Sequence, residues 1–191
     1  MARLITVAPA LALALASAGC GPPPAVAPAP PPPGAFAWRT MRAEHVTTVT
    51  ARTRDGHTTS RRVRGVVAAA RPDRLRLRAL GPAGITLFDL VDRDGRCAVL
   101  GAAPGADARP GGVLDQVLHA LCDDLRAAYR LAPGGRARIT YGDWRPTGRS
   151  VEPYHIAIDD PAAGFRAEIT VVRLTLDEEL DPALFDLPPG R

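Results

Sequence analysis

The sequence contains no lysine, only four histidines and three cysteines, and few aromatic residues. All 24 basic residues are therefore arginine, which indicates a GC-rich genome rather than a particular chemistry. The sequence also lacks a glycine-rich phosphate loop and a Gly-x-Ser-x-Gly nucleophile turn. These two motifs mark many nucleotide-binding proteins and serine hydrolases, so their absence argues against both classes.

The few potential metal ligands do not form a recognisable site. The four histidines are scattered at His45, His57, His119 and His155, without the spacing of a metal-binding motif. The acidic run at residues 177–181 lacks the spaced ligands and turn glycine of a calcium loop, so we interpret it as a solvated turn. We predict no metal, no cofactor and no catalytic residue, and we expect that the protein is not an enzyme.

No apolar run is long enough to remain as a membrane span. Residues 1–19 consist of a short start with one basic residue, an apolar run at residues 4–16 and three small residues. This is the layout of a secretory signal, because a spanning helix needs roughly 20 apolar residues. We predict that residues 1–19 are a signal peptide that is removed on export.

The cysteine that follows the small residues determines the type of signal. The stretch Ser17-Ala18-Gly19-Cys20 resembles a bacterial lipobox, with Ser17 where leucine is preferred. We predict that Cys20 is lipidated and anchors the protein durably, since each buried methylene contributes about 0.8 kcal/mol. The alternative is an ordinary signal peptide with a chance cysteine. Gly21 gives no acidic retention signal, which favours the outer membrane, on the side that faces the periplasm.

Residues 20–34 form the lipidated cysteine and a proline-rich tether, GPPPAVAPAPPPPG after Cys20. The stretch has too few large apolar groups for a core, so we expect an extended polyproline II spacer of about 40 Å. Residues 35–191 have the length of a single domain.

The charges of this domain are unevenly distributed. Residues 39–78 carry eleven arginines against three acidic residues, whereas residues 79–191 carry twelve against seventeen. A basic surface on an exported protein suggests phosphate-bearing lipid headgroups rather than nucleic acid as its anionic partner. The simpler alternative is that Arg76 and Arg78 are solvent-facing strand residues, because they alternate with Leu75 and Leu77.

Two cysteines remain once Cys20 is assigned to lipid. Cys97 and Cys122 would lie in an oxidising compartment, where paired thiols form disulfides, so we predict that they are joined. The alternative is a pair of buried free thiols.

The periodicity predicts strands, one helix and further strands. Alternating or β-branched stretches predict an antiparallel meander over residues 44–52, 58–69, 74–80, 85–91 and 96–100. Apolar residues at helical spacing predict a helix over residues 113–130. Strand patterns return at residues 136–141, 154–158 and 165–176, separated by an expected break at residues 142–150. Phe185 and Leu187 are expected to pin the C-terminus to the core. We predict an α+β fold in which the helix covers the concave face of one curved antiparallel sheet.

The strand segment Arg64-Gly65 and the stretch PDRLRLRALGPAGITLFDL at residues 72–90 resemble the lipoprotein-localisation factors of the Gram-negative envelope. The likeness is greater to the outer-membrane receptor, itself a lipoprotein, than to the soluble periplasmic carrier. It covers about a third of the mature domain. The resemblance implies a half-open β-barrel with a concave apolar face that accepts acyl chains of a lipid or lipoprotein.

Carried over to this chain, the resemblance and the apolar stripe of the helix give a candidate ligand cavity. Its residues are Leu75, Leu77, Leu87, Leu114, Leu118 and Leu121. The turn of Gly81, Pro82, Ala83 and Gly84 would be the membrane-facing loop, although members that insert lipoproteins carry a bulky apolar residue where this chain has Ala83.

The implied partners are acyl chains, the membrane through Cys20 and a periplasmic carrier protein. The expected role is therefore lipoprotein or lipid trafficking to the outer membrane. The alternative is a structural or sensory lipoprotein that uses the same scaffold, with a closed core, to bind a protein partner.

Overall fold

The computed structural model describes residues 30–52, 57–102, 113–132 and 135–188. The predicted signal peptide, Cys20 and most of the tether lie outside this part of the chain. Among the described residues, no helix has the length and apolar character needed to cross a bilayer.

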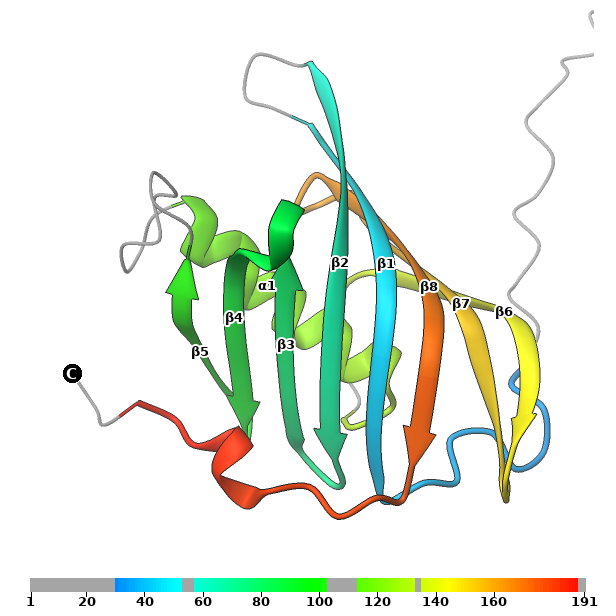
Figure 1. Cartoon of the computed structure of the whole chain (residues 1–191). Coiled ribbons are helices and arrows are strands. Elements are labelled where there is room, and N and C mark those ends of the chain that lie inside the picture. The colour runs from blue at the N-terminus through cyan, green and yellow to red at the C-terminus, as the bar shows by residue number, and fades with distance from the viewer. Residues whose placement is uncertain (1–29, 53–56, 103–112, 133–134, 189–191) are drawn as a thin grey trace, which may run out of the picture.

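Eight strands form one antiparallel sheet in the order β5-β4-β3-β2-β1-β8-β7-β6 (Figure 1). The strands are β1 (Thr40–Arg52), β2 (Thr58–Ala70), β3 (Arg74–Leu80), β4 (Thr86–Arg93), β5 (Arg96–Ala102), β6 (Arg138–Thr147), β7 (Ser150–Asp160) and β8 (Phe165–Leu176). The edge strands β5 and β6 do not pair with each other, so the sheet is open. The predicted five-strand meander is confirmed as β1 to β5.

The predicted break at residues 142–150 is wrong in most of its length. Strand β6 continues through Gly142 and Pro146 to Thr147, and β7 resumes at Ser150. Proline is tolerated there because β6 is an edge strand, where a missing backbone N–H costs the least. Trp144 pairs with Pro153 across these two strands, which makes them a long hairpin.

Within the described ranges there is one long helix, α1 (Val113–Ala128), which lies against one face of the sheet, behind it in Figure 1. We call this face the helix face. Its buried apolar side chains come from most of the strands and pack in one cluster with three helix residues, Cys122, Leu125 and Ala128. The helix makes its main contacts with the edge strand β5 and with β7.

The opposite, outer face of the sheet carries the C-terminal segment. The 3₁₀ helix η2 (Pro182–Phe185) places Phe185 against Ala68 and Val91, with Phe185 only 1% exposed. Leu187 packs against the same cluster, so both residues that were expected to pin the terminus do so. On β2, Ala68 therefore packs in this outer cluster, whereas its neighbours Val67 and Ala69 pack in the main cluster on the helix face.

The described end of the tether joins the fold beside β7. Ala35 forms a parallel bridge with Val151, and the backbone N–H of Ala37 donates to Ser150 Oγ at 2.9 Å. Phe36 and Trp38 are buried. The chain therefore enters the domain at the β6–β7 side of the sheet.

Candidate functional site

The helix face brings several of the predicted cavity residues together. Leu75 and Leu77, from β3, are 0% and 5% exposed and belong to the main core cluster. Leu121 of α1 is partly buried against the same cluster. Leu114 and Leu118 lie in α1, but their side chains are outside the described part of the structure.

Leu87 lies apart from these residues. The pairing of β3 with β4 shifts between Ala79 and Leu80, and Leu87 is the extra residue of this bulge. A Cβ added at Gly81 would lie 2.9 Å from Leu87 Cδ2, so the leucine folds over the turn rather than along the sheet. Gly81 is the residue that permits this close approach.

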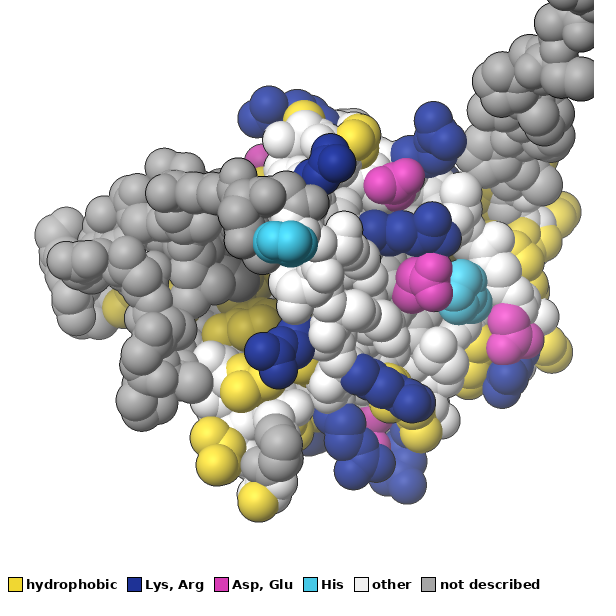
Figure 2. Space-filling view, turned by 90° about the horizontal axis from the view of Figure 1, so that it is seen from above, with side chains coloured by type: hydrophobic (Ala, Val, Ile, Leu, Met, Phe, Trp, Pro, Cys, Tyr) yellow, Lys and Arg dark blue, Asp and Glu magenta, His cyan; other side chains and the backbone are white. Residues whose placement is uncertain are grey.

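The turn between β3 and β4 is the 3₁₀ helix η1 (Pro82–Gly84). Ala83 and Gly84 are exposed, and Ala83 has a positive φ of 56°. The next residue, Ile85, is 60% exposed and is one of the most exposed large apolar side chains among the described residues. The turn itself holds no bulky apolar residue at Ala83, but Ile85 supplies one directly after it. Seen from the end where η1 lies, the surface carries apolar and arginine side chains close together (Figure 2).

A disulfide connects Cys97 of β5 to Cys122 of α1, with their Cα atoms 6.4 Å apart. It fastens the helix to the edge of the sheet. Asp92 lies beside it, 1% exposed, with Oδ1 3.5 Å from Arg126 Nε. Burial raises the pKa of Asp92. The ligand atoms of Asp92, Cys97 and Cys122 lie within 4.8 Å of one another, but sulfurs joined in a disulfide are not thiolate ligands.

His45 is one of the buried polar residues on the helix face. It is 5% exposed, its Nδ1 lies 2.8 Å from Thr47 Oγ1, and burial lowers its pKa from 6.5 to about 4. Its ring lies against Gly65, where an added Cβ would be 2.5 Å from His45 Cε1. A glycine inside a strand often marks such a close approach, so Gly65 was the signal that could have revealed a buried neighbour.

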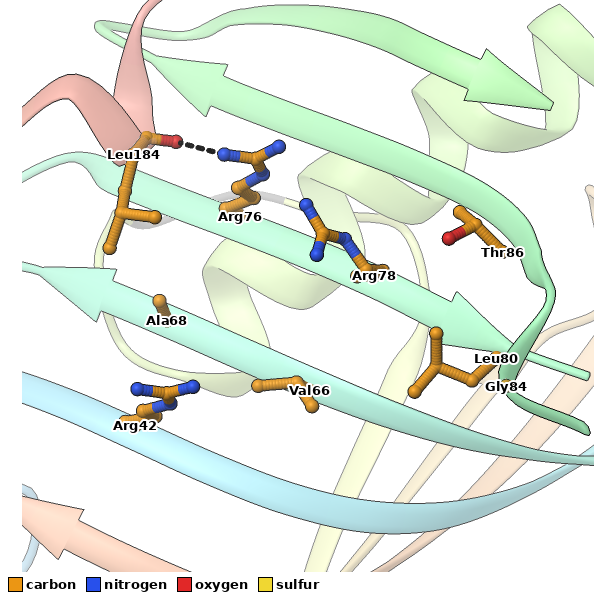
Figure 3. Close-up of a pocket in the computed structure, with 9 residues that line it drawn as sticks. All are labelled: Arg42, Val66, Ala68, Arg76, Arg78, Leu80, Gly84, Thr86 and Leu184. Carbon is orange, nitrogen blue, oxygen red and sulfur yellow. Dashed lines mark hydrogen bonds between the residues drawn. The ribbon is translucent and has the colours of Figure 1, made fainter.

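A pocket of about 280 Å³ lies on the outer face, away from α1 (Figure 3). Its walls come from strands β1 to β4 and from η1 and η2. They are Arg42, Val66, Ala68, Arg76, Arg78, Leu80, Gly84, Thr86 and Leu184. We call it the outer trough. It was not predicted, because Leu184 reaches it from the far end of the chain.

Asp89 fixes two of the arginines of the outer trough. Its carboxylate accepts hydrogen bonds from Arg76 at 2.9 and 2.8 Å and from Arg78 at 3.1 and 3.0 Å. Arg76 also donates to the Leu184 carbonyl at 3.2 Å. Burial alone would raise the pKa of Asp89, but the two guanidinium groups outweigh it and lower that pKa. The arginines predicted to alternate outward are therefore ordered groups rather than freely solvated ones.

No protein-family model matches the chain, and no curated protein is matched by its sequence. Among solved structures, the chain is similar to an outer-membrane lipoprotein-sorting protein domain from Vibrio parahaemolyticus. The TM-score is 0.41 at 8% identity, over 78% of this chain and 90% of that domain. It is also similar to a DUF1329 family protein from Desulfovibrio piger, with a TM-score of 0.34, 8% identity and the same coverage. One of these two neighbours is thus a lipoprotein-sorting domain, while likeness at this level says nothing of this chain's ligand.

Proposed function

We propose that the protein is a non-enzymatic envelope lipoprotein that binds acyl chains of a lipid or lipoprotein on its helix face. The observation that carries the proposal is one open sheet whose apolar face packs against α1, the one long helix of the described residues. In this proposal the helix face is concave, α1 is a lid, and lipidated Cys20 holds the domain at the outer membrane.

The way α1 is attached supports a role as a lid. It is fastened at the β5 edge by the disulfide and contacts β7, while the apolar residues of β1 to β3 lie between these two attachments. If a ligand displaces α1, the apolar side chains of the sheet lose their contacts with the helix and gain apolar contacts with the acyl chain. Pockets for such ligands are mostly apolar and carry few polar groups, here His45, Thr47 and Glu152.

The second candidate is a scaffold with a closed core that binds a protein partner. It is favoured by the small cavity next to Met41, Tyr129 and Ile156, which measures only about 10 Å³. This volume holds at most one water molecule. An acyl chain can enter this part of the helix face only if α1 or the N-terminal segment moves.

Native mass spectrometry separates the two candidates. Residues 20–191 carrying Cys20→Ala are exported to a periplasm, purified without detergent and measured before and after incubation with lipid vesicles. Leu121→Glu places a charge on α1 where the helix meets the sheet, at a residue that is only partly buried. Val172→Glu makes the same kind of change at a side chain that is 60% exposed.

Acyl-chain binding predicts a bound lipid or acyl-peptide mass that is retained in Val172→Glu and lost in Leu121→Glu. Circular dichroism of both variants shows whether the fold is kept. An apo mass in every sample, with a folded protein, would reject acyl binding and leave the scaffold candidate.

A further inference from the structure

The outer trough has an arrangement that the proposed function does not use. Arg42 pairs with Ala68 across β1 and β2, and Ala68 pairs with Arg76 across β2 and β3. Because neighbouring strands lie about 4.8 Å apart, the backbone positions of the two arginines lie about 10 Å apart, with Ala68, which also packs with Phe185, between them. Figure 3 shows the Arg42 side chain next to Ala68, whereas the Arg76 guanidinium group points toward Leu184, and Arg78 follows along β3.

The outer trough carries excess positive charge. Asp89 is shared by Arg76 and Arg78, so one carboxylate faces two guanidinium groups. Arg42 is exposed and also borders a neighbouring pocket that contains Glu44, Arg173 and Glu178. With Arg173 and the two glutamates included, four arginines stand against three carboxylates, which leaves a net charge of +1.

The remaining walls of the outer trough are apolar. Val66, Leu80 and Leu184 line it together with Ala68. A guanidinium group presents paired donors that match phosphate oxygens, so arginines beside an apolar floor suit a phosphate joined to carbon. The volume of about 280 Å³ is just below the usual range for a whole small-molecule ligand, which favours a headgroup over a complete lipid.

We propose that the outer trough binds the phosphate headgroup of an anionic phospholipid at a membrane surface. The phosphate lies between Arg42 and Arg76, and the first methylenes rest on Val66 and Leu80. The trough ends at Gly84 and Thr86, on either side of exposed Ile85, so the same end of the domain can touch the bilayer. This site is on the opposite face from the acyl-chain site and does not depend on it.

Vesicle co-sedimentation tests the proposal with residues 20–191 carrying Cys20→Ala. The vesicles contain either phosphatidylcholine alone or phosphatidylcholine with phosphatidylglycerol. Arg42→Gln removes an exposed charge from the trough, and Arg138→Gln removes one from exposed Arg138 on β6, at the far edge of the sheet. Val66→Phe fills the trough without a change in charge.

We expect binding only to the vesicles that contain phosphatidylglycerol, weakened about fivefold by Arg42→Gln and by less than about twofold by Arg138→Gln. Val66→Phe should weaken it as much as Arg42→Gln while its thermal melt remains cooperative. Equal losses in Arg42→Gln and Arg138→Gln, with no effect of Val66→Phe, would overturn the site in favour of diffuse surface attraction.

A second arm adds inorganic phosphate or glycerol phosphate without vesicles and follows it by ³¹P NMR. Weak or undetectable binding is expected, because a soluble anion gains nothing from the apolar floor. Tight binding of the free anion that Arg42→Gln abolishes would overturn the membrane source and identify a soluble phosphate ligand. Leu121→Glu should leave vesicle binding unchanged, so failure of the acyl-chain site and failure of this site are distinguishable.

Discussion

The two faces of the sheet are built from the same strands but differ in their interactions, which are apolar packing on the helix face and ion pairs on much of the outer face. On β3, Leu75 and Leu77 enter the large core under α1, whereas Arg76 and Arg78 lie on the outer face with Asp89. Alternation along a strand allows this separation. The helix face supplies most of the apolar stabilisation, and the outer face carries ordered charge. A substitution on β3 should therefore mainly affect the stability of the fold if its side chain points to the helix face, and mainly the charged surface if it points to the outer face.

The largest effect is expected for Leu75→Ala. Leu75 is fully buried, so the free energy of unfolding should fall by about 4 kcal/mol from lost apolar contact and the resulting cavity. Leu80→Ala is the matched change on the outer face, where the side chain is only partly buried, and should cost less than half as much. Urea denaturation of both variants gives the two values, and equal losses would contradict the asymmetry of the faces.

Loss of the Cys97–Cys122 disulfide should lower the free energy of unfolding by about 3 kcal/mol, because it closes a loop of 25 residues. The measurement compares the wild type with and without a reductant against the Cys97→Ser/Cys122→Ser double variant. The double variant should match the reduced wild type and should not respond to reductant. If α1 is a lid, the same variant should also take up acyl chains faster.

The faces should also differ in acid sensitivity, beginning with the helix face. His45 is neutral and buried, with its pKa lowered to about 4, so the unfolded chain binds a proton first as the pH falls. Stability should decline from pH 6.5 to about pH 4 by as much as about 3 kcal/mol. Unfolding free energies across this window should be flatter in His45→Gln, and an unchanged slope would contradict a desolvated His45.

The outer face should respond only at lower pH. The pKa of Asp89 is lowered by its two arginines, so its stabilising contribution is present above about pH 4 and is lost as the pH falls below that value. Asp89→Asn should cost about 1–2 kcal/mol at pH 7, because it weakens hydrogen bonds to charged, partly exposed groups. The effect of the substitution on stability should shrink as the pH falls below about 4, as measured by thermal unfolding.

Local patterns in the sequence were enough to predict strands β1 to β5 and helix α1. Strict alternation at residues 74–80 and helical spacing at residues 113–130 each reflect contacts within one element. The β6–β7 hairpin was missed because glycine and proline interrupt its pattern, and an edge strand tolerates both. His45 and the outer trough were missed because they depend on neighbours brought together by the fold, Gly65 in one case and Leu184 in the other.

The most direct test of the account is photocrosslinking with a phospholipid that carries a diazirine at the end of one acyl chain. Residues 20–191 carrying Cys20→Ala are labelled, digested and mapped by mass spectrometry. Acyl binding on the helix face predicts labels on β1 to β3 at residues such as Met41, Val67 and Leu77, and fewer labels in Leu121→Glu. Labels confined to the outer face, or none with lipid present in excess, would contradict the central claim that α1 covers an acyl-chain site.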